Sequence, residues 1–293
     1  MFRRLGYYLL AIFFFLPMIL ARRITRVPDA IDFSENDAEF MARHEGEFER
    51  TEITESRFGH KLQITFFPVE TRDTRTCVLI AHGLGGKIEQ MYPQAIAFHE
   101  ENCDVCLFDF RGHGKSGGAF SSLGYLEMFD IMAITDWLRR EKKISRIVLY
   151  GFSMGAVATI LAAAYGGAVD GVIAESPFDS MENIVLHNAQ KMLRVPRFFV
   201  RMLLWGTDVR RNIEYKVVDI VRALPRLKGV PLLLVGTASD ATVPVAQTRR
   251  AAEQLGEGQV YWEIDGPAHG AILTSEHGPE FRRRIRDLLA RCK

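Results

Sequence analysis

The chain has 293 residues, more than the usual ~100–200 of one domain but within the range of a single α/β unit. Its 37 basic and 36 acidic side chains give a net charge of +1, so no overall attraction directs it to nucleic acid. Cys103 and Cys106 have Cys-x-x-Cys spacing without a second pair, which argues against a metal site and against a disulfide-stapled framework. We expect one main domain with an appendage and no nucleic-acid partner, and the oligomeric state stays open.

The amino terminus contains an uncharged apolar stretch at residues 5–21, flanked by two arginines on each side. At ~1.5 Å per residue, a helix of this length spans about 25 Å, slightly less than a ~30 Å hydrocarbon core. Flanking arginines can extend to cover the difference, so we expect an uncleaved, single-pass membrane anchor within residues 1–26. A signal peptide cleaved after Ala21 is the alternative. The side of the membrane that the main domain occupies stays open, because the two flanks carry nearly equal positive charge.

Residues 27–48 contain seven acidic side chains, which indicates a solvated tether between the anchor and the main domain. Two alternating apolar runs, 48–54 and 62–67, then flank Gly59 and predict an antiparallel hairpin. Strands and helices alternate after this point, which favours an α/β fold with a mostly parallel sheet covered by helices on both faces. The predicted strands are 77–82, 105–110, 146–152, 171–175, 231–236 and 259–264. The predicted helices are 87–101, 126–143, one directly after Ser153, 245–255 and 279–291.

The most informative motif is Gly151-Phe152-Ser153-Met154-Gly155, which follows a run of apolar residues and precedes an alanine-rich helix. Gly-x-Ser-x-Gly in this setting forms a sharp strand-to-helix turn that lifts the serine oxygen above the edge of the sheet. A glycine-rich loop without function would not explain why a polar serine ends a buried strand. We therefore predict that Ser153 is a nucleophile.

Three further segments have the same form, an apolar strand that ends in a glycine-rich or acidic turn: 78–86, 107–116 and 236–244. With the serine motif they make residues 49–293 resemble an α/β-hydrolase, similar to the branch of monoacylglycerol-lipase-like and serine-aminopeptidase-like enzymes. In that superfamily an insertion at the position of residues 179–229 forms a helical cap over the active site. The middle of this segment, 191–205, is both apolar and basic. Either its apolar side packs on the core and its arginines are solvated, or Phe198, Phe199 and Trp205 insert into a membrane.

A serine hydroxyl needs a base within hydrogen-bond reach and an acid that orients the base. His269 follows the last predicted strand in a loop of small residues, and Asp240 follows the strand before it, which gives the order serine, acid, histidine. Glu175 and Asp179 are the alternative acids. The other histidines considered and set aside as the base are His82, His113, His187 and His277.

The resemblance also implies that the backbone N–H groups of Leu84 and Met154 bind the oxyanion of the reaction, each such donor being worth ~2.7–4 kcal/mol. It implies no metal and no organic cofactor. Asp109 is expected to anchor the turn at residues 111–114.

Together these features predict a membrane-anchored serine hydrolase that cleaves small-molecule carboxylic esters, among them lipid-derived acyl esters, through an acyl-enzyme on Ser153. A peptidase or thioesterase would use the same three residues. The alternative from another class is a catalytically silent scaffold that acts as a membrane-bound binding protein, which an intact set of three residues argues against.

Overall fold

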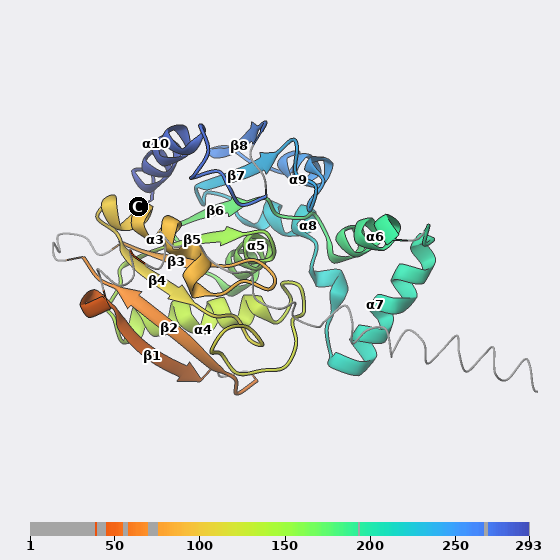
Figure 1. Ribbon diagram of the computed structural model, residues 1–293, viewed down its shortest axis with the longest axis horizontal. Coiled ribbons are helices and arrows are strands. Elements are labelled where there is room, and N and C mark those ends of the chain that lie inside the picture. The colour runs from red at the N-terminus through yellow and green to blue at the C-terminus, as the bar shows by residue number, and fades with distance from the viewer. Residues whose placement is uncertain are drawn as a thin grey trace, which may run out of the picture.

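The computed structural model describes residues 39, 45–54, 58–69, 76–192, 194–266 and 269–292. At its centre lies an eight-stranded sheet in the order β1-β2-β4-β3-β5-β6-β7-β8 (Figure 1). β1 and β2 form the predicted antiparallel hairpin, β2 also pairs antiparallel with β4, and the remaining pairs are parallel. The strands are β1 Glu49–Thr54, β2 Lys61–Phe67, β3 Thr76–Ala81, β4 Asp104–Phe108, β5 Arg146–Phe152, β6 Gly171–Glu175, β7 Leu232–Thr237 and β8 Gln259–Ile264.

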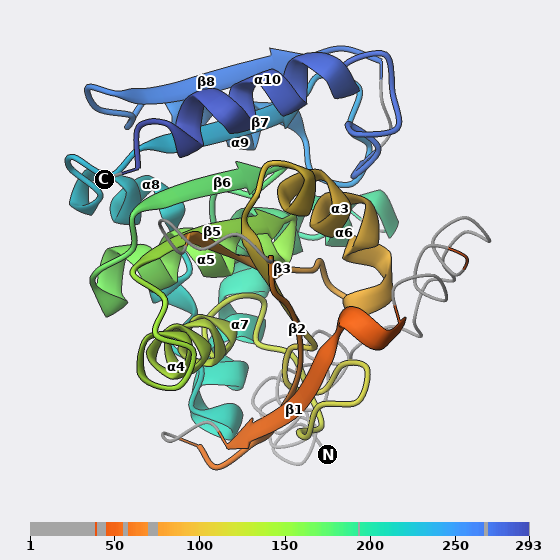
Figure 2. The same cartoon turned by 90° about the vertical axis from the view of Figure 1, so that its left-hand side faces the viewer.

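The central strands are short apolar runs that are buried on both faces. Every residue of β4, β6 and β7 is buried, as expected for parallel strands covered by helices on both sides. Two apolar clusters form these two faces: α4 (Glu127–Arg140), α5 (Met154–Gly166) and α9 (Val245–Ala252) pack on one, and α3 (Tyr92–Glu100) and α10 (Gly278–Leu289) pack on the other (Figures 1 and 2). The predicted α/β fold with a mostly parallel sheet is confirmed.

One predicted helix has a different form. Instead of a continuous helix over 87–101, a 3-10 helix at Ile88–Met91 precedes α3, which begins at Tyr92 with Pro93 in its first turn. Proline has no N–H and a fixed φ near −65°, so it suits the first turn of a helix and not the interior of a longer one. Asp109 also accepts a 2.9 Å hydrogen bond from the Ile88 N–H, which fixes the chain before the helix.

Between β6 and β7 the chain leaves the sheet and forms a separate helical layer, at the right of Figure 1. This layer contains α6 (Met181–Met192), α7 (Arg197–Arg211) and η3 (Tyr215–Val217). The chain then returns to the sheet through α8 (Ile220–Ala223) and η4 (Leu224–Arg226), which pack on α5. We call residues 181–229 the cap.

The predicted membrane anchor, residues 1–26, lies outside the described residues. Among the residues that the structure does describe, no helix is long and apolar enough to cross a membrane.

Candidate active site

Ser153 lies in the sharp turn between β5 and α5 that the sequence predicts. Its backbone has φ 54° and ψ −117°, a conformation that costs a residue with a side chain ~1–3 kcal/mol. The Ser153 N–H donates a 2.8 Å hydrogen bond to the carbonyl of Glu175, which ties the turn to the neighbouring strand. At Gly155 a Cβ atom would lie 2.3 Å from the Ala81 carbonyl oxygen, so only glycine fits where α5 passes β3. The strain is therefore held by close packing on both sides of the serine.

Asp240 and His269 form a direct pair, with 2.5 Å between Asp240 Oδ2 and His269 Nδ1. The other carboxylate oxygen of Asp240 accepts hydrogen bonds from the backbone N–H groups of Thr242, at 2.7 Å, and Val243, at 2.9 Å. Burial works against ionisation of Asp240, but the hydrogen bonds from His269 and the two amides outweigh it and hold its pKa below the usual value. Because an ionised carboxylate only accepts hydrogen bonds, Nδ1 of His269 carries the proton and Nε2 has a free lone pair.

Ser153 and His269 line the same cavity, whose volume is about 590 Å³. Among the described residues that line it, His269 is the only ionisable one, and most of the others are apolar. The sheet side contributes Gly83, Leu84, Leu123, Phe152, Met154, Phe178, Thr242 and Val243, and the cap contributes Ile184, Val185, Asn188, Ala189 and Leu203. An apolar cavity with few polar groups beside a nucleophile and base is suited to a small apolar ligand.

The two predicted oxyanion donors, Leu84 and Met154, also belong to this cavity. Met154 is the first residue of α5, where helix N–H groups have no partner within the helix. Leu84 follows Gly83, at which a Cβ atom would lie only 3.1 Å from the Phe152 ring, so this loop lies directly against the serine turn.

His82 fixes the loop of residues 83–84 through its ring nitrogens. Its Nε2 accepts a 3.0 Å hydrogen bond from the Phe110 N–H, so Nδ1 carries the proton and donates to the Gly83 carbonyl at 2.7 Å. Burial lowers the pKa of His82 to about 3, which keeps the ring neutral. This arrangement fits a role in shaping the loop.

The two alternative acids have other partners. Glu175 accepts a hydrogen bond from the hydroxyl of Tyr150, and burial raises its pKa to about 7. Asp179 forms an ion pair with Arg250 at 2.6 Å and accepts hydrogen bonds from Asn183. Neither residue lines the cavity that Ser153 and His269 share.

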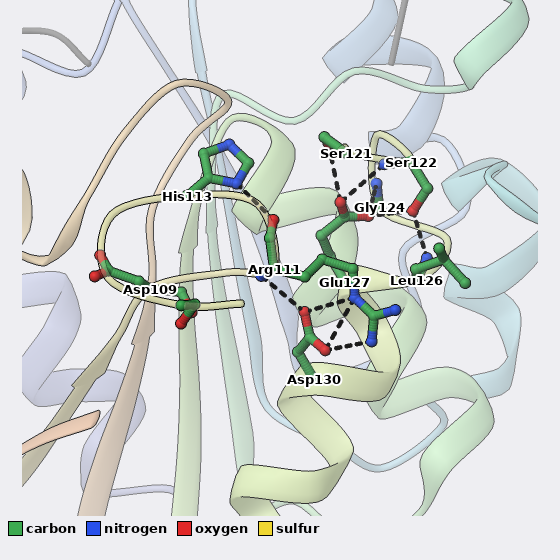
Figure 3. A network of polar contacts seen from close by, with 10 residues as sticks. Asp109, Arg111, His113, Ser121, Ser122, Gly124, Leu126, Glu127 and Asp130 are labelled. Carbon is green, nitrogen blue, oxygen red and sulfur yellow. Dashed lines mark hydrogen bonds and ion pairs between the residues drawn. The ribbon is translucent and has the colours of Figure 1, made fainter. Parts of the chain in front are cut away.

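A buried polar network holds the loop between β4 and α4 (Figure 3). Asp130 of α4 pairs with the guanidinium of Arg111, and the Asp130 carboxylate also accepts the Arg111 backbone N–H at 3.2 Å. Glu127 accepts hydrogen bonds from the backbone N–H groups of Ser122 and Gly124, both at 2.9 Å. Leu123 lies between these two residues and lines the cavity, so the network fixes one wall of the site.

The turn after β4 is anchored by Asp109. Its carboxylate accepts the N–H groups of Ile88, at 2.9 Å, and Lys115, at 2.8 Å. His113 lies in the same turn and is paired with the backbone, Nδ1 lying 2.9 Å from the Arg111 carbonyl oxygen (Figure 3). His277 likewise makes a backbone contact, 2.9 Å from the Asp265 carbonyl to Nε2.

Two residues of α6 have roles at the site that the sequence did not indicate, one in the cavity wall and one in a contact beside it. Asn188 supplies a polar side chain to the cavity wall, and Lys191 Nζ donates a 2.5 Å hydrogen bond to the Ala241 carbonyl. Lys191 thus links the cap to the loop that carries Asp240. Helical spacing places 184, 185, 188 and 189 on one face, and this periodicity was the available signal.

Comparison with known proteins agrees with this geometry. Residues 72–217 match the family model described as serine aminopeptidase, S33. The chain belongs to the α/β-hydrolase superfamily. The family match together with the fold supports a hydrolase.

Proteins from several organisms are similar to this chain along most of its length. The uncharacterized protein YqkD of Bacillus subtilis is 24% identical over 81% of this chain and 78% of its own length. The uncharacterized protein YfhR of Escherichia coli strain K12 is 26% identical over 82% of this chain and 80% of its own length. The solved structure of the Pyrococcus furiosus esterase Pf2001 has a TM-score of 0.71 and 22% identity, covering 91% of this chain and 99% of that protein. At this identity, the esterase establishes the likeness in fold.

Proposed function

We propose that this hydrolase cleaves carboxylic esters with apolar acyl groups through an acyl-enzyme on Ser153. The observation that carries the proposal is the Asp240–His269 pair at a cavity that the strained serine also lines. The solved esterase with the same fold is consistent with this chemistry.

In the proposed mechanism, Ser153 Oγ attacks the ester carbonyl carbon while Nε2 of His269 takes the hydroxyl proton. Asp240 holds His269 in the required tautomer and stabilises the imidazolium. The tetrahedral oxyanion accepts hydrogen bonds from the N–H groups of Leu84 and Met154. His269 then gives the proton to the departing alcohol. In the second half, His269 takes a proton from the water that attacks the acyl carbonyl carbon and returns it to Ser153 Oγ as the bond to the acyl group breaks and the carboxylic acid leaves.

The character of the cavity favours esters over peptides as substrates. An aminopeptidase must bind a positively charged α-amino group, for which a carboxylate is the natural partner. Among the described lining residues there is no acidic side chain, and the walls are mainly aliphatic or aromatic. Burial of each further CH₂ of an acyl chain would contribute about 0.8 kcal/mol, which favours longer acyl groups until the cavity is full.

A substrate series tests this assignment. Purified protein is assayed with p-nitrophenyl esters of increasing acyl length and with aminoacyl p-nitroanilides. Ser153→Ala serves as the inactive variant, and His277→Ala serves as the control variant that should stay active. We expect kcat/KM to rise with acyl length, no turnover of the anilides, and loss of turnover in Ser153→Ala alone. Faster cleavage of the anilides than of every ester would favour a peptidase.

We also propose that residues 5–21 anchor the enzyme in a membrane. The support is the length of the uncharged segment and the arginines on both sides of it. Such an anchor, with an acidic tether of residues 27–48, would keep the active site close to lipid-derived esters.

A further inference from the structure

Helix α7 has two apolar faces, and only one of them packs on the part of the protein that the structure describes. Val200, Leu204 and Thr207 form the buried face. A second row, Phe198, Met202, Trp205 and Val209, follows helical spacing along the outside, and we call it the α7 stripe. Exposed fractions are 56% for Phe198, 46% for Trp205 and 57% for Val209. Because these side chains gather in one row, they form a contiguous apolar surface of the kind that marks an interaction site.

Beside the stripe lies a second cavity, of about 460 Å³, separate from the catalytic one. Four cationic side chains line it, against two carboxylates: Arg197, Arg201, Lys216 and Arg222 against Glu182 and Asp219. Arg197 and Arg201 both pair with Glu182, at 2.7 and 3.1 Å, and Arg222 pairs with Asp219 at 3.1 Å. The positive charge is therefore only partly compensated, and the cavity is suited to an anion.

The charge of the cap as a whole points the same way. Residues 181–229 contain ten Lys and Arg against four Asp and Glu, a net charge of +6, whereas the entire chain has +1. The remainder of the protein is thus net negative, and the positive charge is concentrated in the cap. Such a surface attracts an anionic partner and repels a second copy of itself.

The order of surfaces around α7 relates this face to the catalytic cavity. Arg197 and Arg201 lie on the side of the cationic cavity, the α7 stripe is next around the helix, and Leu203 on the far side lines the catalytic cavity. In Figure 1, α7 runs along the outer edge of the cap, away from the sheet. A flat partner that covers the stripe would touch the cationic cavity and lie beside the catalytic one.

We propose that the outer face of α7 docks this enzyme on the surface of an anionic lipid bilayer. The α7 stripe enters the acyl region in the plane of the membrane, and the cationic cavity binds headgroup phosphates or carboxylates. Arginine and tryptophan side chains suit this boundary, because each combines an apolar body with a polar end. The uncharged residues 5–21 would not neutralise the cationic cavity, which favours lipid over this segment as the occupant of the stripe. The idea that docking brings the catalytic cavity to lipid substrates rests on the proposed function. Docking itself does not depend on catalysis, so Ser153→Ala protein should dock like the wild type.

Depth-dependent quenching of Trp205 tests the docking in the full chain. One variant, Trp137→Phe/Trp262→Phe, keeps only Trp205, and a matched control, Trp137→Phe/Trp205→Phe, keeps only Trp262, which packs on Phe281. Both are reconstituted in vesicles whose acyl chains carry bromine, composed of phosphatidylcholine with or without phosphatidylserine. We expect Trp205 to be quenched several-fold more than Trp262, and more strongly with phosphatidylserine. Equal, weak quenching of both residues would overturn the proposal. If cross-linking then revealed a dimer that covers the α7 stripe, a second copy of the chain and not a bilayer would be its partner.

Charge reversal tests the role of the cationic cavity. Lys216→Glu/Arg222→Glu should abolish the preference for phosphatidylserine, whereas Arg140→Glu/Lys143→Glu, a matched change outside the cap, should leave it intact. Circular dichroism verifies that both variants are folded. Loss of the preference in both, or in neither, would contradict a specific role of the cavity. Saturable binding of inorganic phosphate without any lipid preference would mean that the cavity takes a free anion, and would overturn docking.

Discussion

Replacement of Asp240 by asparagine tests the catalytic geometry most informatively, because the structure determines how the new amide must orient. One carboxylate oxygen of Asp240 accepts two backbone N–H groups, from Thr242 and Val243. In the variant the amide oxygen must keep this position, since an NH₂ group there would face two donors. The NH₂ group then points at Nδ1 of His269, at the position where the Asp240 oxygen lies 2.5 Å away.

This orientation forces the wrong tautomer on the histidine. Nδ1 of His269 must accept a hydrogen bond, so the proton moves to Nε2, which can no longer take the proton of Ser153. We expect kcat to fall roughly 10⁴-fold, which corresponds to about 5 kcal/mol, with a smaller change in KM. The fold should be preserved, because side-chain volume and the two backbone contacts are retained.

Steady-state kinetics on the best p-nitrophenyl ester measures the effect, with thermal unfolding as the check on folding. Glu175→Gln is the matched control, since Glu175 is the alternative acid and its carboxyl is engaged by Tyr150. Activity of Asp240→Asn near that of the wild type, together with loss of activity in Glu175→Gln, would refute the assignment of the acid.

Three further predictions concern stability and location. The pKa of Glu175 is raised by burial from 4.5 to about 7, so its contribution to stability is complete below pH ~4.5 and is lost as pH rises through about 7. Glu175→Gln should therefore remove roughly 3 kcal/mol from the pH dependence of the free energy of unfolding. Urea unfolding at pH 5 and pH 8 measures this dependence, and an unchanged dependence in the variant would contradict the prediction. Asp130→Ala removes the carboxylate that pairs with the buried guanidinium of Arg111 and should cost about 3–5 kcal/mol in the same assay, so a loss below 1 kcal/mol would contradict the pairing. Full-length protein should resist carbonate extraction from membranes while a chain without residues 1–26 is soluble and active, and a mature chain that starts at Arg22 would identify a cleaved signal instead.

Most strands were predictable because buried strands consist of short runs of apolar residues. β5, β6 and β8 begin and end at the predicted residues. β5 and β6 have short, buried apolar interiors, whereas β8 is half-buried and mixes apolar and aromatic residues with Gln259 and Glu263. Less predictable was the break before α3, where Pro93 and the Asp109 contact divide one predicted helix into two.

The site was predictable only in its motif-bearing part. The turn around Ser153 and the order serine, acid, histidine can be read along the chain, and the structure brings Asp240 and His269 together and places His269 and Ser153 on one cavity. Their catalytic roles stay a prediction. The cavity walls from α6 and the contact of Lys191 with Ala241 depend on how the cap folds back over the sheet, which no local pattern encodes.

The cap illustrates why composition alone was ambiguous. Packing of α7 on the core and exposure of an apolar surface were opposed interpretations of residues 191–205, and the helix does both, on different faces. One of these interpretations left the arginines of the segment solvated, whereas Arg197 and Arg201 both pair with Glu182. Ion pairs between residues of different helices cannot be predicted from the sequence before the relative positions of the helices are known.

The central claim, that Ser153 is the activated nucleophile, is tested most directly by labelling with a fluorophosphonate probe followed by peptide mass spectrometry. We predict a single modified residue, Ser153, in the wild-type protein, and no labelling in folded Ser153→Ala protein. Labelling of another serine, or labelling of Ser153→Ala at the wild-type rate, would contradict the account.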